Sequence, residues 1–419
     1  MDNIQTALLE KFQTVYHRTP EIVAYAPGRV EILGNHTDYN EGYVLSAAIN
    51  LGTYFAVAPR TDGVTRLTAG DVMETVEYDT AHPVATKEHS WSNYVKGVQA
   101  GLNEECLRRK SHDTDRNVCA TGVDAMFLGN IPLGSGLSSS AALEVSAGLA
   151  LSRHFGLEIA PLAMAKIAQQ AEHRFAGVKC GLMDQMTSLF GKRDAMVWSD
   201  FRHLTAQTVP VPRDICFLLC NTKARHALVD GAYNERREAC ERAARYFASV
   251  LDHPVTALRD VRWREWEAHK EGSTDIPVCA QDTERTDRNV CATFMRRAAH
   301  PIGENERVLE GVECLKHGDV AGFGKLMFAS HESSRVYFEN SCPELDALVD
   351  AAKTIPGVLG ARLTGGGFGG SVVVMVPVRN AESVSAALGH AYESRFATPC
   401  DVRTVVCSEG AKTILDFRF

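Results

Sequence analysis

The feature that most constrains this fold is a loop of small residues set between a strand and a helix. Residues Val123 to Ile131 alternate as in a half-buried strand, and Ala141 to Phe155 are rich in Ala and Leu, which predicts a helix. The loop between them reads Pro-Leu-Gly-Ser-Gly-Leu-Ser-Ser-Ser over residues 132–140. Small residues let an anion approach the backbone N–H groups, and the helix N-terminus adds positive potential.

This loop differs from the P-loop pattern, because the lysine of Gly-x-x-x-x-Gly-Lys-Ser/Thr is absent. A phosphate site here must therefore draw its positive charge from elsewhere, such as a metal ion or the helix terminus. The alternative is a serine-capped helix after a flexible loop. The loop alone leaves both interpretations open.

A second glycine motif follows a predicted strand at Ile22 to Ala26, which we expect to stop at Pro27-Gly28. Gly28 and Gly34 frame a short apolar run that leads into a dense polar cluster from residues 35 to 39. Such a cluster offers the mixture of donors and acceptors that a polyhydroxyl ligand requires. The alternative is a turn in which Asn and Asp satisfy the backbone. The region from Tyr43 to Pro59 predicts either a strand pair or one long apolar strand.

A third motif, Thr364 to Ser371, contains five glycines in six residues before a valine-rich strand. That many glycines carry a large cost in chain entropy, so another group must approach the backbone closely. The motif does not decide whether this group is a neighbouring loop or a ligand. Further short apolar strands are predicted at Ile215 to Asn221 and Ser371 to Pro377.

Composition excludes several classes of protein. The length of 419 residues predicts two or three domains, and alternating helical and strand-like segments predict a mixed α and β class. The net charge of −8 without a basic run argues against nucleic-acid binding. No apolar run is long enough for a membrane span, and the first residues lack the pattern of a signal peptide. Twelve cysteines without a Cys-x-x-Cys pair indicate free thiols, so we expect a cytoplasmic protein.

Together the three motifs resemble the GHMP kinase superfamily, and the second narrows the resemblance to its galactokinase family, whose signature reads roughly Gly-Arg-x-Asn-hydrophobic-Ile-Gly-Glu-His-x-Asp-Tyr. Other stretches resemble the same family in the same order along nearly the whole chain. They are residues 171–173, 180–185, 232–237, 304–308 and 341–346. Several motifs in one order are far more specific than any single glycine loop.

The resemblance implies an α+β fold of two lobes around a cleft. Residues 1–208 would form a lobe like domain 2 of ribosomal protein S5, carrying the sugar motif and the phosphate loop. Residues 209–419 would form a ferredoxin-like lobe that brings the third glycine motif to the cleft. The boundary is placed by Pro210 and Pro212, which interrupt the pattern between Gln207 and Asp214. We expect a monomer whose partners are a small sugar and ATP, with no nucleic acid and no membrane.

The resemblance also implies an activity and the residues that carry it. The expected reaction transfers the γ-phosphoryl group of ATP to the C1 hydroxyl of galactose, with Mg²⁺. Asp184 matches the catalytic base and Arg29 the residue that stabilises the transition state. Ser140 and Glu172 match the Mg²⁺ ligands. Gly134, Ser135, Gly136, Leu137, Ser138, Ser139 and Ser140 match the nucleotide-binding loop, and Asn35, His36, Thr37, Asp38 and Tyr233 match the sugar-binding positions.

Two of these roles can be weighed against simpler ones. Arg29 could pair with Asp184 and with the transferring phosphoryl group, whereas the alternative for Asp184 is an N-cap before Met186 to Phe190. Glu172 borders a helical stripe of Met164, Ala168, Ala171 and Phe175 that begins after Pro161. A carboxylate beside a core face requires a cation, which can be Mg²⁺ or a neighbouring Lys or Arg.

The chain departs from the family signature at two positions. Glu31 and Asn35 stand where the signature has Asn and Glu. We hypothesise that the two residues have exchanged roles within one sugar pocket, which makes Glu31 a further substrate-binding candidate. The departure keeps N-acetylgalactosamine or arabinose open as the sugar. A non-catalytic galactose sensor and a glycine-rich binding module without ATP are the remaining alternatives.

One octapeptide occurs twice. Thr114 to Thr121 recurs letter for letter at Thr286 to Thr293, and a degenerate copy spans Thr274 to Ala280. The copies have no fixed period, which argues against a solenoid. They would form either a twin-cysteine binding site or insertions in surface loops, and their polar surroundings favour insertions.

Overall fold

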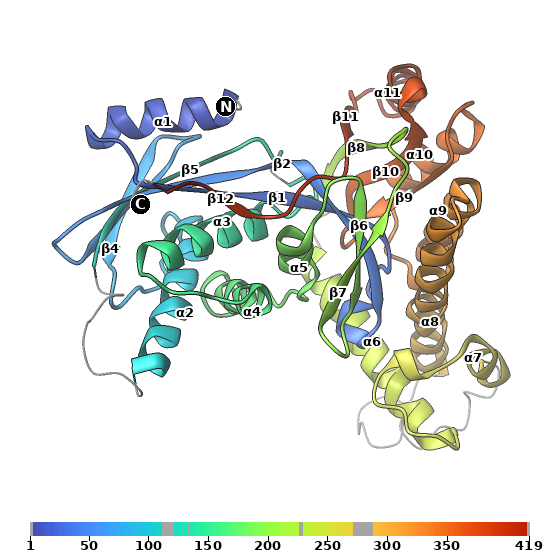
Figure 1. Ribbon diagram of the computed structural model, residues 1–419. Helices are drawn as coiled ribbons and strands as arrows, with labels where there is room; N and C mark the ends of the chain where they lie inside the picture. The colour runs from blue at the N-terminus through green and yellow to red at the C-terminus, as the bar shows by residue number, and fades with distance from the viewer. Residues whose placement is uncertain (1–2, 111–120, 133, 226–228, 271–287, 417–419) are drawn as a thin grey trace.

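The computed structural model describes residues 3–110, 121–132, 134–225, 229–270 and 288–416. The described chain forms two β-sheets with helices packed on their faces, one sheet at each end of the view in Figure 1. This arrangement confirms the mixed α+β class with two lobes. Within the described residues, no helix has the length and apolar composition that crossing a bilayer requires.

Within the described ranges, the first sheet has eight strands in the order β12-β1-β2-β5-β3-β4, with β6 paired to β2 and β7 paired to β6. The strands are β1 (Ile22–Leu33), β2 (Tyr43–Pro59), β3 (Val64–Ala69), β4 (Glu74–Asp79), β5 (Val123–Gly129), β6 (Ala195–Asp200), β7 (Thr205–Pro210) and β12 (Lys412–Asp416). Only the β3–β5 pair is parallel among these described strands. The last strand, β12, pairs antiparallel with β1, so the end of the described chain returns to the first sheet.

Strand β1 does not stop at Pro27-Gly28, contrary to the sequence-based expectation. It continues to Leu33, with a shift of register between Pro27 and Arg29. At the shift the chain passes close to the serine-rich loop, and the Arg29 backbone N–H donates to the Leu137 carbonyl at 3.1 Å. A Cβ on Gly28 would lie 2.7 Å from that same oxygen, so glycine permits the approach. Strand β2 is one long strand rather than a strand pair.

Helices cover both faces of the first sheet, as Figure 1 shows. Helix α1 (Asn3–Tyr16) packs on one face through Leu8 and Phe12. The other face carries α2 (Ser92–Lys110), α3 (Ser139–His154), α4 (Pro161–Ala171) and α5 (Met183–Phe190). The predicted strand–loop–helix unit is confirmed as β5, the loop and α3, which begins two residues earlier than expected.

The second sheet has four antiparallel strands in the order β11-β8-β10-β9. They are β8 (Ile215–Arg225), β9 (Gly360–Thr364), β10 (Gly369–Pro377) and β11 (Asp401–Val405), with α10 (Pro343–Thr354) and α11 (Ala381–Phe396) packed against them. Reading these elements in chain order gives β8-α10-β9-β10-α11-β11. This is a ferredoxin-like arrangement, as the resemblance implied.

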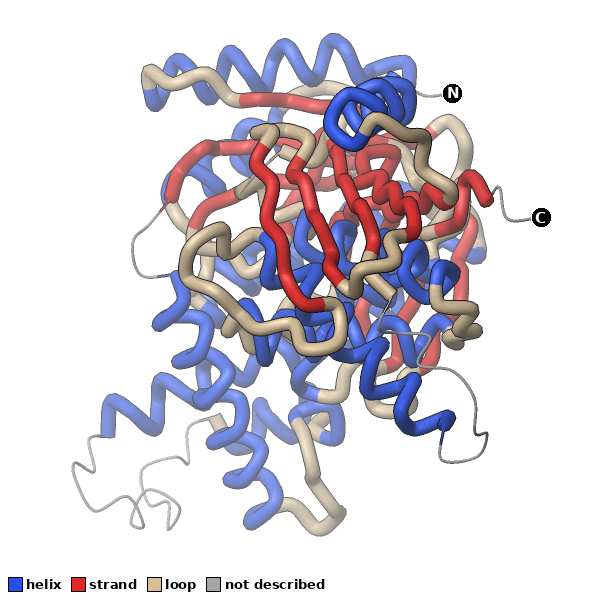
Figure 2. The backbone as a smooth tube through the Cα atoms, turned by 90° about the vertical axis from the view of Figure 1, so that its left-hand side faces the viewer, coloured by secondary structure: helices blue, strands red, loops and turns tan. Residues whose placement is uncertain are grey.

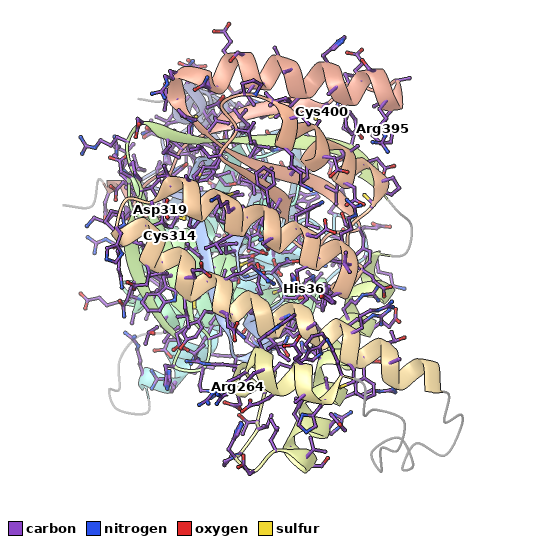
Figure 3. All side chains as sticks on the ribbon, turned by 90° about the vertical axis from the view of Figure 1, so that its right-hand side faces the viewer. His36, Arg264, Cys314, Asp319, Arg395 and Cys400 are labelled. Atoms are coloured by element: carbon purple, nitrogen blue, oxygen red, sulfur yellow. The ribbon has the colours of Figure 1, made fainter. Side chains whose placement is uncertain are left out.

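A group of helices is inserted between β8 and α10. It comprises α6 (Val229–Val250), α7 (Trp263–His269), α8 (Arg288–Lys316) and α9 (Val320–Ser333). Figure 3 looks onto α8 and α9, and Figure 2 shows the opposite side of the molecule. Of the repeated octapeptides, residues 288–293 lie in α8, so this part of the second copy is helical rather than a surface loop. The first copy, apart from Thr121, and the degenerate copy lie outside the described residues.

The two lobes share one hydrophobic core. The largest buried cluster contains Val30 and Leu45 from the first sheet together with Phe217 and Val373 from the second. Burying such side chains stabilises the folded state by about 1.5–3 kcal/mol each. Hydrophobic packing therefore holds the two lobes against one another. The expected boundary at residues 208/209 falls within β7 and stays a prediction.

Candidate active site

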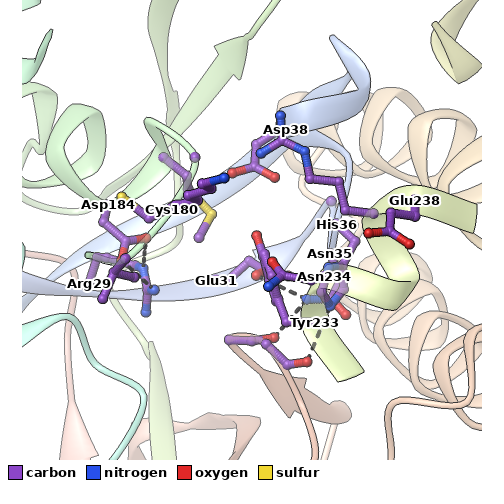
Figure 4. A pocket seen from close by; sticks show the side chains of 18 of the residues that line it. Arg29, Glu31, Asn35, His36, Asp38, Cys180, Asp184, Tyr233, Asn234 and Glu238 are labelled. Atoms are coloured by element: carbon purple, nitrogen blue, oxygen red, sulfur yellow. Dashed lines mark hydrogen bonds and ion pairs between the residues drawn. The ribbon is translucent and has the colours of Figure 1, made fainter. Parts of the chain in front are cut away.

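The polar residues singled out in the sequence gather around a cavity of about 720 Å³ (Figure 4). Its walls come from β1 and the turn after it, the segment 177–184, the start of α6 and the glycine-rich turn between β9 and β10. The predicted residues that line it are Arg29, Glu31, Asn35, His36, Asp38, Asp184 and Tyr233. Segments more than 300 residues apart in sequence therefore meet at one site.

Arg29 and Asp184 form a two-pronged ion pair in this cavity, in which Arg29 is buried and Asp184 is half-buried. Arg29 Nε lies 2.7 Å from Asp184 Oδ1, and Arg29 Nη2 lies 2.8 Å from Oδ2. Burial opposes the charge of Arg29, but the Asp184 carboxylate, together with Glu31 and Glu172, more than offsets this cost, so the pKa of the guanidinium is raised. Asp184 lies in the first turn of α5, whose N-cap is Leu182, so the N-cap alternative for Asp184 is wrong.

A smaller cavity of about 270 Å³ adjoins the first and is lined by the serine-rich loop. All seven residues of the predicted nucleotide loop, Gly134 to Ser140, contribute to its lining. Arg29, Gly365 and Gly366 line both cavities. The third Arg29 nitrogen, Nη1, donates to the Gly136 carbonyl at 2.6 Å. One guanidinium thus joins the serine-rich loop to the Asp184 carboxylate.

The third glycine motif packs against the serine-rich loop. Ser371 Oγ donates to the Ser135 carbonyl at 2.7 Å, and a Cβ on Gly365 would lie 3.5 Å from the Gly136 carbonyl oxygen. Gly365 and Gly367 have φ of +79° and +82°, a conformation that side chains disfavour. The question left open by the sequence is answered: another loop approaches these glycines, and two of them also face the cavities.

Glu172 lies beside the start of α3, where the nearby Cys180 and Ser140 side chains favour its charged form. It is 4% exposed, and burial raises the pKa of Glu172 despite these two neighbours. A buried carboxylate next to a hydroxyl that lines the smaller cavity fits Mg²⁺, which is usually held by one or two carboxylates together with substrate phosphates. Ser140 and Glu172 are therefore suitable donors for this ion.

His36 is neutral in this site. Burial is the largest influence and lowers the pKa of His36 to about 3. Its Nε2 lies 3.2 Å from the Gly366 carbonyl, which can only accept, so Nε2 carries the proton. Nδ1 then accepts from the Tyr39 hydroxyl at 2.9 Å. The ring also packs against Phe338 and Tyr233, so His36 forms part of an aromatic wall.

Asp38 faces the cavity from the turn after β1. Burial, together with the nearby Glu31 and Asp184 carboxylates, raises the pKa of Asp38 to about 6, although the Tyr39 backbone N–H stabilises its charged form. The carboxylate packs directly against the Cα of Gly181, where a Cβ would overlap Asp38 Oδ2. Glycine at position 181 therefore fixes where the Asp38 carboxylate can sit.

We expect Gly181→Ala to raise the KM for the sugar that the resemblance implies about tenfold or more, because the new methyl group must displace the Asp38 carboxylate. The KM for the nucleotide should change less than twofold, since Gly181 does not line the smaller cavity. Steady-state kinetics with each substrate varied in turn check this. Gly389→Ala in α11, where an added Cβ meets nothing within 4 Å, is the matched control. An unchanged sugar KM in the Gly181 variant would contradict the prediction.

Glu31 and Asn35 lie in the same cavity and contact one another. Asn35 Nδ2 donates to Glu31 Oε2 at 3.2 Å and to the Gly365 carbonyl at 2.8 Å. Thr37 is different, because it is fully buried and is not among the lining residues. Its hydroxyl contacts the Gly34 and Tyr43 carbonyls at 2.7 and 2.5 Å. The geometry gives Thr37 a role in the turn, and its predicted contact with the sugar stays a prediction.

The sequence analysis missed several residues of this site. Arg362 on β9 donates to Glu31 Oε1 at 2.9 Å, and Asn340 Nδ2 donates to Asn35 Oδ1 at 3.0 Å. The rim also carries charged side chains from α6, among them Arg237 and Glu238. The sequence could have indicated Arg362, because it is a charged residue between Ala361 and Leu363 in a mostly apolar strand. Asn340 directly precedes residues 341–346, a stretch that resembles the family, but the resemblance itself did not include Asn340.

Comparison with known proteins agrees with this geometry. The galactokinase galactose-binding signature matches residues 10–59, which include β1 and the turn after it. The GHMP kinases N terminal domain matches residues 93–192, and the GHMP kinases C terminal domain matches residues 312–394. The three matches follow the order of the motifs along the chain.

Whole-chain relatives and structures extend the match. A galactokinase of Actinobacillus pleuropneumoniae serotype 5b is 39% identical, covering 95% of this chain and 98% of the relative. One of Haemophilus influenzae is 37% identical, covering 96% and 97%. The crystal structure of Lactococcus lactis galactokinase complexed with galactose superposes with a TM-score of 0.84 at 31% identity, covering 98% and 100%. The mevalonate kinase of Methanococcus jannaschii shares the fold, with a TM-score of 0.60 at 16% identity. The chain belongs to the galactokinase family of the GHMP kinases.

Proposed function

We propose that this chain transfers the γ-phosphoryl group of ATP to the C1 hydroxyl of galactose, giving galactose 1-phosphate and ADP. The observation that carries the proposal is the Arg29–Asp184 pair, which lies where the polar cavity meets the cavity of the serine-rich loop. A sugar in the first cavity and nucleotide phosphates in the second would meet at this pair. Membership of the galactokinase family supports galactose as the sugar.

The chemistry of the pair suits phosphoryl transfer. Phosphoryl transfer depends chiefly on positioning and on stabilising charge around the moving group. In the proposed reaction the Asp184 carboxylate accepts the proton of the attacking hydroxyl. Arg29, fixed by Asp184 on one side and by the Gly136 carbonyl on the other, stabilises negative charge on the transferred group. The buried setting strengthens both interactions because water screens them poorly.

Ser140 and Glu172 are the residues we propose to hold Mg²⁺ beside the nucleotide phosphates. When bound, the ion would neutralise negative charge on the phosphate oxygens. The Ser140 hydroxyl at the first turn of α3 and the buried Glu172 carboxylate would orient the phosphates toward Arg29. The backbone N–H groups at the start of α3 add positive potential at the same place.

A coupled assay of ADP release tests the proposal directly. Galactose, N-acetylgalactosamine, glucose and arabinose should be offered separately with ATP and Mg²⁺, and we expect the largest kcat/KM with galactose. Preference for another sugar in this panel would replace galactose as the substrate. ADP release with none of the four would favour a sugar sensor over an enzyme.

We expect kcat/KM for galactose to fall as the pH drops below about 6 and to approach a tenfold decrease per pH unit. The raised pKa of Asp38, about 6, means that its carboxylate becomes protonated in this range and loses acceptor capacity for sugar hydroxyls. A pH profile of kcat/KM measures the effect. In Asp38→Asn the overall value should be lower and this acidic limb absent. An acidic limb near pH 6 that persists in this variant would assign the titration to another group.

A further inference from the structure

Arg362 is a fully buried cation at the junction of the two lobes. It stands on β9 of the second sheet, is 0% exposed and is the largest side chain buried to that degree in the part of the chain that the structure describes. Its Nη1 donates to Glu31 Oε1 at 2.9 Å and to the Ile32 carbonyl at 3.2 Å. Among the described residues, its Nε and Nη2 have no hydrogen-bond partner. Because a desolvated guanidinium requires a counter-charge, the Glu31 carboxylate is central to keeping Arg362 buried.

Other carboxylates do not replace Glu31 in this role. Glu304 is near enough to interact electrostatically with Arg362, but its oxygens are bonded to Arg307 at 2.6 Å and to Ser330 at 2.6 Å. Glu31 has its other oxygen, Oε2, turned to Asn35 Nδ2. It therefore joins the buried cation on one side to the wall of the sugar cavity on the other.

The amide of Asn35 is committed to the protein. Both N–H bonds of Nδ2 have acceptors, namely Glu31 Oε2 and the Gly365 carbonyl, and Oδ1 accepts from Asn340. Figure 4 shows Glu31 and Asn35 next to one another in the wall of the cavity. Asn35 thus ties the turn after β1 to the glycine-rich turn, whereas Glu31 brings the negative charge to this wall. Burial raises the pKa of Glu31, whereas Arg362 and Asn35 oppose that rise by stabilising its charged form. With Glu31 ionised, the three side chains carry one negative and one positive charge between them.

We propose that Arg362 is a positioning residue for sugar binding. From the opposite lobe it holds Glu31 in place as the carboxylate of this cavity wall, so that residues 31, 35 and 362 act as one charge-balanced unit. The inference rests on the proposed function and adds to it a residue that does not line the cavity. In such a unit the carboxylate can belong to residue 31 or to residue 35, because the two side chains are hydrogen-bonded to one another.

The charge-exchange variants test this unit. Glu31→Asn leaves Arg362 without its counter-charge, and Asn35→Glu places two carboxylates against one cation, so each should raise the KM for galactose about 30-fold or more. The double variant Glu31→Asn/Asn35→Glu keeps the same atoms and the same net charge. Its KM for galactose should return to within about fivefold of the wild-type value. A double variant no better than the worse single variant would overturn the proposal.

Arg362→Met tests the positioning role. We expect a rise of at least tenfold in the galactose KM, with the ATP KM within about twofold of wild type. Arg403→Met on β11 of the same sheet, at an exposed ion pair with Asp401, is the matched control. A purely structural role for Arg362 would lower the melting temperature and leave the galactose KM of the folded enzyme unchanged, which would contradict the inference. If Arg362→Met does not fold, the charge-exchange variants decide the question.

The failure of the proposed function would be distinguishable from the failure of this inference. Wild-type protein that releases no ADP with galactose contradicts the activity. The unit would then be tested by the shift in melting temperature that galactose produces in the same variants. Recovery of that shift in the double variant supports the unit, and loss of the shift in all three exchange variants overturns it.

Discussion

Asp184→Asn is expected to lower kcat for galactose phosphorylation by about 10²- to 10⁴-fold, the usual contribution of a positioned general base. Asparagine has nearly the same shape, but its amide presents a donor where one carboxylate oxygen meets an Arg29 nitrogen, and it accepts a proton far less readily. The KM values should change much less than kcat, because the cavity walls remain in place. Rates of ADP release at saturating galactose and ATP measure this effect.

The matched control for this prediction is Asp194→Asn. Asp194 is an aspartate of the same lobe, partnered with the exposed Arg213 at 2.9 Å, and it does not line the larger or the smaller cavity. Its backbone has φ of +56°, which asparagine tolerates. The control should retain nearly full activity. An Asp184→Asn enzyme with more than a tenth of the wild-type kcat would mean that another group accepts the proton.

Glu304→Ala is expected to destabilise the protein by about 3–5 kcal/mol, the cost of breaking a buried ion pair from one side. Glu304 on α8 is fully buried, and its oxygens contact Arg307 at 2.6 Å, Ser330 at 2.6 Å and the Gly34 backbone N–H at 3.0 Å. The substitution removes the partner of Arg307 and releases the glycine turn after β1. Urea-induced unfolding measures the loss, with the exposed Glu310→Ala on the same helix expected to lie within about 0.5 kcal/mol of wild type.

The stability loss caused by Glu304→Ala should depend on pH. Burial alone would raise the pKa of Glu304, but Arg307 and the other nearby groups together hold it well below its usual range. A lowered pKa in the folded state means that this stabilisation is present above the unfolded pKa of about 4.3 and is lost as the pH falls below it. The stability difference between wild type and Glu304→Ala should therefore shrink on acidification below pH 4. A difference that stays constant from pH 7 to pH 3.5 would show that the carboxylate charge does not cause it.

Local patterns in the sequence were sufficient for much of the fold. The small-residue loop between β5 and α3 was predicted because strand and helix periodicities flank it within a short stretch. The continuation of β1 beyond Pro27-Gly28 was not predicted. Proline and glycine normally end a strand, and only packing against the Leu137 carbonyl explains why the chain bends there and continues.

Local spacing and family resemblance were enough to select Arg29, Asp184, Ser140 and Glu172 as candidates for the site. Which side chains meet there followed from the packing of the folded chain. The Thr37 hydroxyl bonds to backbone carbonyls rather than lining the cavity. Arg362 is distant in sequence and comes from an apolar strand of the other lobe, yet its side chain contacts Glu31. The physical reason is that hydrogen bonds and ion pairs form between groups that packing brings together, and the packing of two sheets around one core is a property of the whole chain.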